Sequence, residues 1–172
     1  MRSDPRLRLP IMLIVALLVQ TTVLARMRVW GVMPDFMLLV AVAGGITAGP
    51  TRGAALGFAS GMLIDLFLPT PLGLSALVFT LVGYGVGVAN TGVLRSAWYI
   101  SVLTAAAGST AGVVLYAVVG SVLGERMIDG HLATIALVVG VSNAVLAPVA
   151  VRFVAWSLGS ERRRRPLKAG AT

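Results

Sequence analysis

Cysteine is absent from this sequence of 172 residues, and charged side chains are scarce, since Asp, Glu, Lys and Arg together make up only 12% of it. Without thiols, disulfides, thiolate zinc sites, iron–sulfur clusters and cysteine nucleophiles are excluded. An ordinary soluble domain has about 25% charged and 45–50% apolar residues, whereas 58% of this chain is hydrophobic. A water-soluble fold of this size needs more polar surface. The composition therefore predicts an all-α integral membrane protein without a separate soluble domain.

Six apolar stretches are separated by breaks rich in Pro and Gly. A helix needs roughly 20 residues to cross a bilayer core of about 30 Å, so the chain has room for a single bundle over residues 1–160. We expect spans near 7–25, 30–48, 53–68, 72–89, 97–123 and 132–158. The second and third stretches are short, so thin, tilted or partly re-entrant helices are expected there.

Basic residues are distributed unevenly between the ends of these stretches. With six spans and both termini in the cytoplasm, most of the 14 Lys and Arg residues lie inside, and Arg26, Arg28 and Arg126 lie outside. The first stretch also resembles a signal peptide, but its cleavage would oppose this distribution, so we expect it to be retained. Residues 161–172 form a basic tail, expected to be cytoplasmic and disordered. Topology and attraction of the tail to anionic lipids explain the net charge of +8 without nucleic-acid binding.

Glycines recur at four-residue spacing. Gly53, Gly57 and Gly61 share one face of the third expected span, and Gly83 and Gly87 repeat the spacing in the fourth. Such faces allow another helix to approach to backbone contact. Either they pack inside the chain's own bundle, or they receive a transmembrane helix of a partner. Under the second interpretation, Gly57→Leu or Gly61→Leu abolishes complex formation while insertion remains intact.

Few polar side chains lie within the expected spans, where they are costly. Asp35 follows Pro34 at the outer start of the second span, which suits helix capping or ion pairing, and a partner or ligand contact is the alternative. Asp65, near the outer end of the third span, is open to both roles. Asn143 and Gln20 predict hydrogen bonds between helices, with a ligand contact as the alternative.

No motif for enzymatic chemistry is present. The sequence lacks His-Glu-x-x-His, Gly-x-Ser-x-Gly and a Gly-rich phosphate loop with Lys. An intramembrane aspartyl protease is disfavoured because no Gly precedes Asp65 by two residues, and because Asp35 and Asp65 lie near the same membrane face. The single histidine, His131, has only two loop carboxylates near it, which is a poor metal-ligand set. We therefore predict no catalytic, metal or cofactor site.

Three ordered blocks carry a resemblance to a known family. They are Pro34-Asp35-Phe36, then Gly57-Phe58-Ala59-Ser60-Gly61 with Asp65 four residues later, then Pro71-Leu72-Gly73-Leu74-Ser75-Ala76-Leu77 with Gly83-Tyr84. In this order, within a short chain of about six spans, the blocks are similar to the rod shape-determining protein MreD family. The resemblance is dense over residues 30–87, and beyond it only length and hydropathy agree.

The resemblance implies a non-enzymatic component of the bacterial cell-elongation machinery in the inner membrane, without a cofactor. Members of the family work with MreC, the MreB filament, RodA and a class B penicillin-binding protein. The implied partners are therefore an MreC-like protein, RodA and the penicillin-binding protein, with an indirect link to MreB. The family also resembles in fold the substrate-binding subunits of energy-coupling-factor vitamin transporters. Such a subunit is the alternative function, although residues 11–25 lack the Ala-x-x-x-Ala contact motif typical of its first helix.

Overall fold

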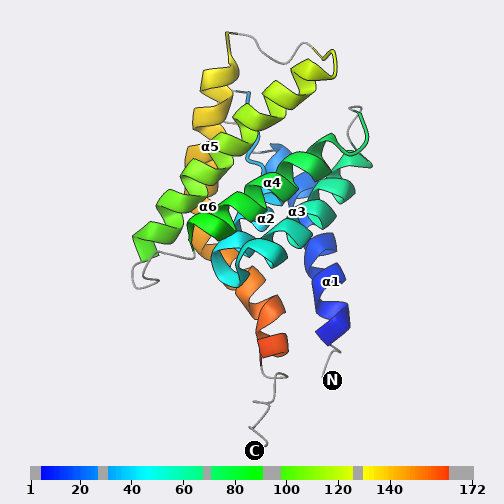
Figure 1. Ribbon diagram of the computed structural model, residues 1–172, viewed down its shortest axis with the longest axis vertical. Helices are drawn as coiled ribbons and strands as arrows, with labels where there is room; N and C mark the ends of the chain where they lie inside the picture. Colours follow the sequence, from blue (N-terminus) through cyan, green and yellow to red (C-terminus); the bar gives the residue numbers. More distant parts are fainter. Residues whose placement is uncertain (1–4, 27–30, 68–70, 91–97, 126–129, 163–172) are drawn as a thin grey trace, which may run out of the picture.

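A computed structural model describes residues 5–26, 31–67, 71–90, 98–125 and 130–162, which form a helical bundle (Figure 1). The α-helices of this part of the chain are α1 (Pro5–Leu18), α2 (Phe36–Ala48), α3 (Pro50–Asp65), α4 (Leu74–Ala89), α5 (Trp98–Val122) and α6 (Leu132–Arg162). Helix α1 continues through a π-helical turn, Val19–Val23, and a 3-10 turn, Leu24–Arg26. The predicted all-α fold is confirmed.

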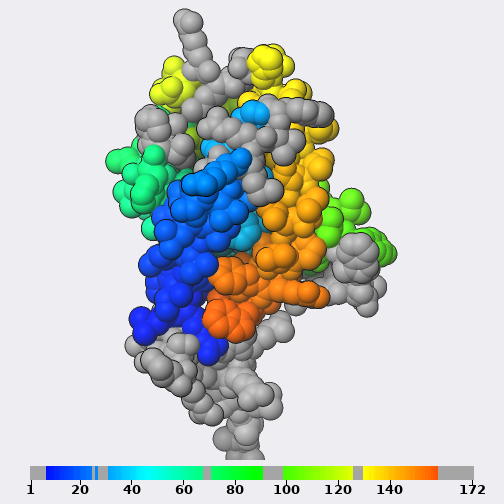
Figure 2. Space-filling view, turned by 180° about the vertical axis from the view of Figure 1, so that it is seen from behind, coloured from blue at the N-terminus to red at the C-terminus, as the bar shows by residue number. Residues whose placement is uncertain are grey.

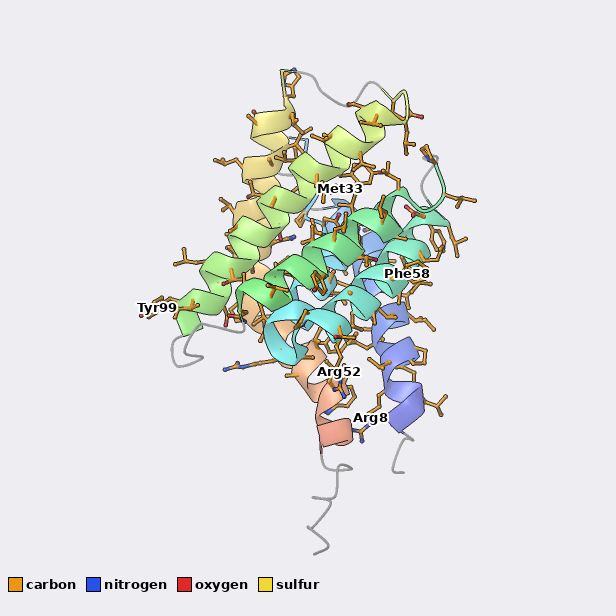
Figure 3. The ribbon with its side chains drawn as sticks, in the orientation of Figure 1. Arg8, Met33, Arg52, Phe58 and Tyr99 are labelled. Carbon is orange, nitrogen blue, oxygen red and sulfur yellow. The ribbon has the colours of Figure 1, made fainter. Side chains whose placement is uncertain are left out.

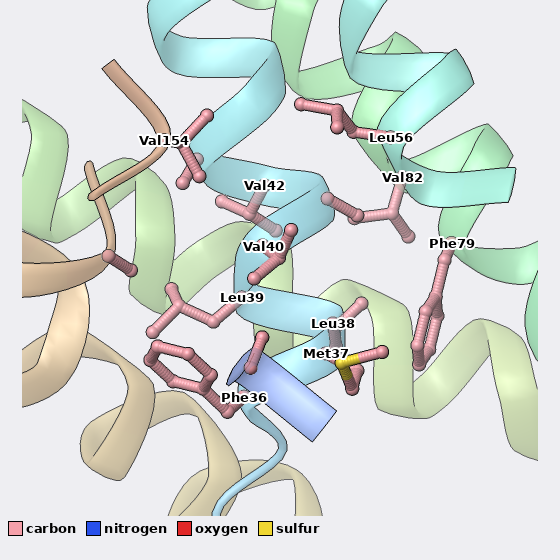
Figure 4. Close-up of a cluster of buried hydrophobic side chains, with 14 of the residues drawn as sticks. Phe36, Met37, Leu38, Leu39, Val40, Val42, Leu56, Phe79, Val82 and Val154 are labelled. Carbon is pink, nitrogen blue, oxygen red and sulfur yellow. The ribbon is translucent and has the colours of Figure 1, made fainter. Parts of the chain in front are cut away.

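Helix α2 lies at the centre of the bundle. Its residues 36–46 are all buried, because the helix is apolar on every side and such a helix must be covered all round. The other five α-helices all contact it. Figure 4 shows its side chains among Val154 of α6, Leu56 of α3 and Val82 of α4. The packing core of the protein is therefore built around α2.

A tight turn joins α2 to α3. Gly49 ends α2 with a φ of +85°, a conformation that side chains with a Cβ rarely adopt. Pro50 then occupies the first position of α3, where its missing N–H costs no helical hydrogen bond. Helix α3 therefore begins at Pro50, three residues before the start of the third expected span. Helix α2, within the second expected span, begins at Phe36, and the described residues directly before it, 31–35, are not helical.

Helix lengths divide the bundle into two groups. The segments Tyr99–Val122 of α5 and Leu132–Leu158 of α6 are each long and apolar enough to cross a membrane. Helix α2, with 13 residues, and helix α3, with 16, are about 20 and 24 Å long at 1.5 Å per residue. Both are shorter than a bilayer core of about 30 Å.

The start of α1 and the end of α6 lie at the same end of the bundle, and α5 and α6 are joined at the other (Figure 1). Figure 2 shows α1, in blue, lying along α6, in orange. The guanidinium carbon of Arg8 lies 5.3 Å from the ring centroid of Trp156, a cation–π contact. The Ser157 hydroxyl donates to Met12 Sδ at 3.0 Å. Two polar contacts thus attach α1 to α6 near the chain ends.

Several expected features fall on residues outside the described part of the chain. They are Arg28 and Arg126 of the expected outer face and residues 163–172 of the expected tail.

Candidate functional site

The glycine face of α3 lies directly against the main chain of α4. A Cβ at Gly57 would overlap the carbonyl of Phe79, and a Cβ at Gly61 would overlap the main chain of Ala76. These two helices share the most extensive contact of any described helix pair. Small residues permit this approach because a side chain at either position would force the backbones apart.

The other expected glycines complete the same interface. Gly53 of α3 and Gly83 of α4 lie against each other, and Gly87 lies against Pro50 at the start of α3. Gly45 of α2 joins them, since a Cβ there would come within 2.9 Å of Gly87 N. The structure therefore brings all five predicted glycines together inside the chain. Helix α4 occupies the face of Gly57 and Gly61, so a partner's helix would reach it only by displacing α4.

Asp65, at the end of α3, forms hydrogen bonds with the start of α4. Its side chain is 1% exposed. Oδ2 accepts from Gly73 N at 2.9 Å and from Ala76 N at 3.2 Å, and Oδ1 accepts from Ser75 N at 3.1 Å. Gly73, at the N-cap position with a φ of +94°, has no side chain to satisfy these free N–H groups. Asp65 therefore caps α4 from the neighbouring helix.

Asp35 and Gln20 together cap the first turn of α2. Oδ1 of Asp35 accepts from Leu38 N at 3.0 Å and from Gln20 Nε2 at 3.3 Å. Gln20 Oε1 accepts from Met37 N at 2.7 Å. Gln20 belongs to the π-helical turn that follows α1, and such turns re-aim side chains relative to a regular helix. Residues from two separate elements therefore satisfy the start of the central helix, with Pro34 buried directly before the cap.

Asn143 of α6 connects this cap to α5. Its Nδ2 donates to the carbonyl of Asp35 and to the hydroxyl of Ser109, both at 2.9 Å. Asn143 and Ser109 are fully buried, and Oδ1 of Asn143 has no hydrogen-bond partner within the described ranges. The sequence identified Gln20, Asp35 and Asn143 separately, but it missed Ser109, since a serine in an apolar helix carries no distinctive signal.

A cavity of about 480 Å³ opens beside the Asp35 cap. Its wall combines the π-helical turn, residues 32–35 before α2, and side chains of α2 to α6. Met33, 44% exposed, lies on this wall. Figure 3 shows Met33 well away from the end of the bundle that carries Arg8 and Arg52. The cavity therefore lies in the half of the bundle opposite those arginines.

The described residues contain no group of three or more His, Cys, Asp or Glu side chains that could hold a metal ion. The polar side chains at the two helix starts bind main-chain N–H groups of neighbouring elements. Together with two helices that are long and apolar enough to cross a membrane, they define an α-helical bundle whose buried polar groups join helices.

Comparison with models of known protein families identifies the family to which this helical protein belongs. The family model of the rod shape-determining protein MreD matches residues 1–149, so the chain belongs to the MreD family, and the predicted resemblance is confirmed. This family comprises membrane components that determine cell shape. Searches of curated proteins and of solved structures found no significant match.

Proposed function

We propose that the protein is a non-enzymatic, multi-pass component of the cell-elongation machinery in the bacterial inner membrane. It acts by binding an MreC-type protein, with RodA and a class B penicillin-binding protein as further partners. The observation that carries this proposal is the family match over residues 1–149. The buried side chains of Asp65 and Asn143 support a non-enzymatic role, because each forms hydrogen bonds that join neighbouring elements of the bundle.

The proposed topology has six spans with both termini in the cytoplasm. The start of α1 and the end of α6 lie at one end of the bundle, as an even number of passes requires (Figure 1). Arg8 and Arg52 lie at that end (Figure 3), in agreement with the rule that basic residues stay inside. Helix α2 is shorter than the bilayer core, but its residues 36–46 are covered by other helices, so this part of the helix meets protein and not lipid.

Cysteine labelling tests this topology directly, because the natural chain has no cysteine to remove. Glu125→Cys, after α5, is expected to react with a membrane-impermeant maleimide in intact spheroplasts. Thr51→Cys, at the start of α3, is expected to react only after permeabilisation. Both positions are exposed in the structure, so accessibility within the protein does not limit either reaction. Labelling of Thr51→Cys from outside would contradict the proposed orientation.

The partners are tested by purifying a C-terminally tagged chain in mild detergent and identifying the associated proteins by mass spectrometry. We expect an MreC-type protein, together with RodA or a class B penicillin-binding protein, to be enriched over a tagged, unrelated membrane protein. Recovery of an energy-coupling module, with its transmembrane subunit and ATPases, would overturn the proposal in favour of vitamin uptake. The proposed contacts are between helices, on faces other than the glycine face that α4 covers.

A further inference from the structure

The cavity beside Asp35 has the dimensions of a ligand site. Its volume of about 480 Å³ lies within the 300–1,000 Å³ typical of small-molecule sites. Most of its wall is apolar and comes from different helices, with Leu38 from α2, Phe79 from α4, Val113 from α5 and Val139 from α6. An occupant of this space would therefore bury an apolar body against side chains that the packing of the bundle holds in place.

One end of the cavity is polar, because Gln20 and Asp35 line it. Within the described residues, Leu38 N and Gln20 Nε2 both donate to Oδ1 of the Asp35 carboxylate, and the main-chain N–H of Met37 also interacts with this carboxylate. Oδ2 is left to accept from an occupant. Gln20 is itself held by Met37 N, so the polar end is ordered before any ligand arrives. Preorganisation of this kind lowers the entropy lost on binding.

The charge at this end selects the head group of the occupant. A carboxylate in an apolar wall favours a cation that also donates hydrogen bonds, since such a pair is stronger than a neutral contact. No Lys or Arg from the described part of the chain pairs with Asp35. Met33, which lines the same cavity as Asp35, lies away from Arg8 and Arg52 (Figure 3). The cavity is therefore on the outer side of the bundle in the proposed topology.

We propose that this cavity binds an amphiphile with an apolar body and a primary-amine head, the amine donating to Oδ2 of Asp35. This chemistry has two sources, an aminophospholipid of the bilayer and a soluble amine with an apolar body. The inference goes beyond the proposed function, because it concerns a ligand of this chain alone and its test requires no partner protein.

Native mass spectrometry of the protein, delipidated in detergent, tests the proposal with two probes. Phosphatidylethanolamine has a primary ammonium that donates hydrogen bonds, whereas phosphatidylcholine of the same acyl chains has a quaternary ammonium that cannot. We expect about tenfold tighter binding of phosphatidylethanolamine, the effect of one charge-assisted hydrogen bond. Phenethylamine represents a soluble amine with an apolar body, and its binding is measured as a rise in the melting temperature of the protein. Binding of phenethylamine without the lipid preference would support the amine site and assign it to a soluble ligand.

Two variants separate ligand binding from folding. Asp35→Asn retains an oxygen for Leu38 N but loses the charge, so the amine preference is expected to disappear. Ile135→Trp fills the cavity from α6 and is expected to abolish binding of every probe. Leu137→Trp is the matched control, because Leu137 lies on the same helix, is 59% exposed and does not line the cavity. If the wild-type protein neither prefers phosphatidylethanolamine over phosphatidylcholine nor binds phenethylamine, the proposal is overturned. It is also overturned if Ile135→Trp binds the probes as well as Leu137→Trp does.

Discussion

Replacement of Gly57 by leucine is expected to prevent α3 from packing on α4 and to leave little folded protein. The added side chain would overlap the main-chain carbonyl of Phe79, and a helix backbone cannot move aside as a flexible side chain can. Overpacking of a core typically costs about 1–3 kcal/mol, and this position belongs at or above the upper end of that range. Even Gly57→Ala is expected to lower the melting temperature, because the first carbon already overlaps.

Gly85→Leu is the matched control for this prediction. Gly85 lies on α4 itself, is exposed, and has no atom within 4 Å of a built Cβ. Its replacement is expected to preserve stability, since glycine in a helix interior is the less favourable residue. Fluorescence-detected size exclusion of both variants, followed by thermal melting in detergent, provides the measurement. A Gly57→Leu protein that elutes and melts like the wild type but no longer recovers its partners would instead assign this face to a partner helix.

Removal of the Asp65 carboxylate is the second change with a large expected effect. Asp65→Ala leaves the N–H groups of Gly73, Ser75 and Ala76 without their acceptor in a buried position. A hydrogen bond to a charged group contributes about 1.5–3 kcal/mol, and an unsatisfied buried donor adds its own cost. We therefore expect a loss of about 3 kcal/mol or more in the free energy of unfolding.

Asp65→Asn provides a graded comparison. Its amide keeps one accepting oxygen but presents an NH₂ group where the second oxygen accepts from two main-chain donors. Its stability is expected to lie between that of wild type and Asp65→Ala. Glu125→Ala, which removes an exposed carboxylate, is expected to melt like the wild type. All three are compared by thermal melting in one detergent, and equal melting of Asp65→Ala and Glu125→Ala would exclude the capping role.

The sequence predicted those features that depend on local chemistry. The all-α fold follows from apolar stretches. One of the expected breaks rich in Pro and Gly falls at Gly49-Pro50, where the structure has a glycine with a positive φ and a proline without an N–H. The small-residue faces were found from four-residue spacing. The spacing could not decide what covers them, because it is the same whether the covering helix belongs to this chain or to another. Only the three-dimensional structure shows that α4 of this chain covers Gly57.

Other features depend on contacts between distant parts of the chain. The second expected span includes Val32 and Met33 because they are apolar, and in the structure they lie in a non-helical segment that lines the cavity. Hydropathy does not distinguish a residue facing lipid from one facing an internal space. The hydrogen bond from Asn143 to Asp35 joins residues 108 positions apart. No local pattern indicates such a pair, and none indicates that Asp65 caps a helix whose own N-cap is a glycine.

The enclosure of α2 has a consequence for biogenesis. This helix leaves the ribosome before α5 and α6, which cover part of its surface. Until they arrive, one side of a helix only 13 residues long must be covered by lipid or by the insertion machinery. The carbonyl of Asp35 also lacks its Asn143 donor until α6 docks. Closure of the core around α2 therefore requires helices that are synthesised well after it.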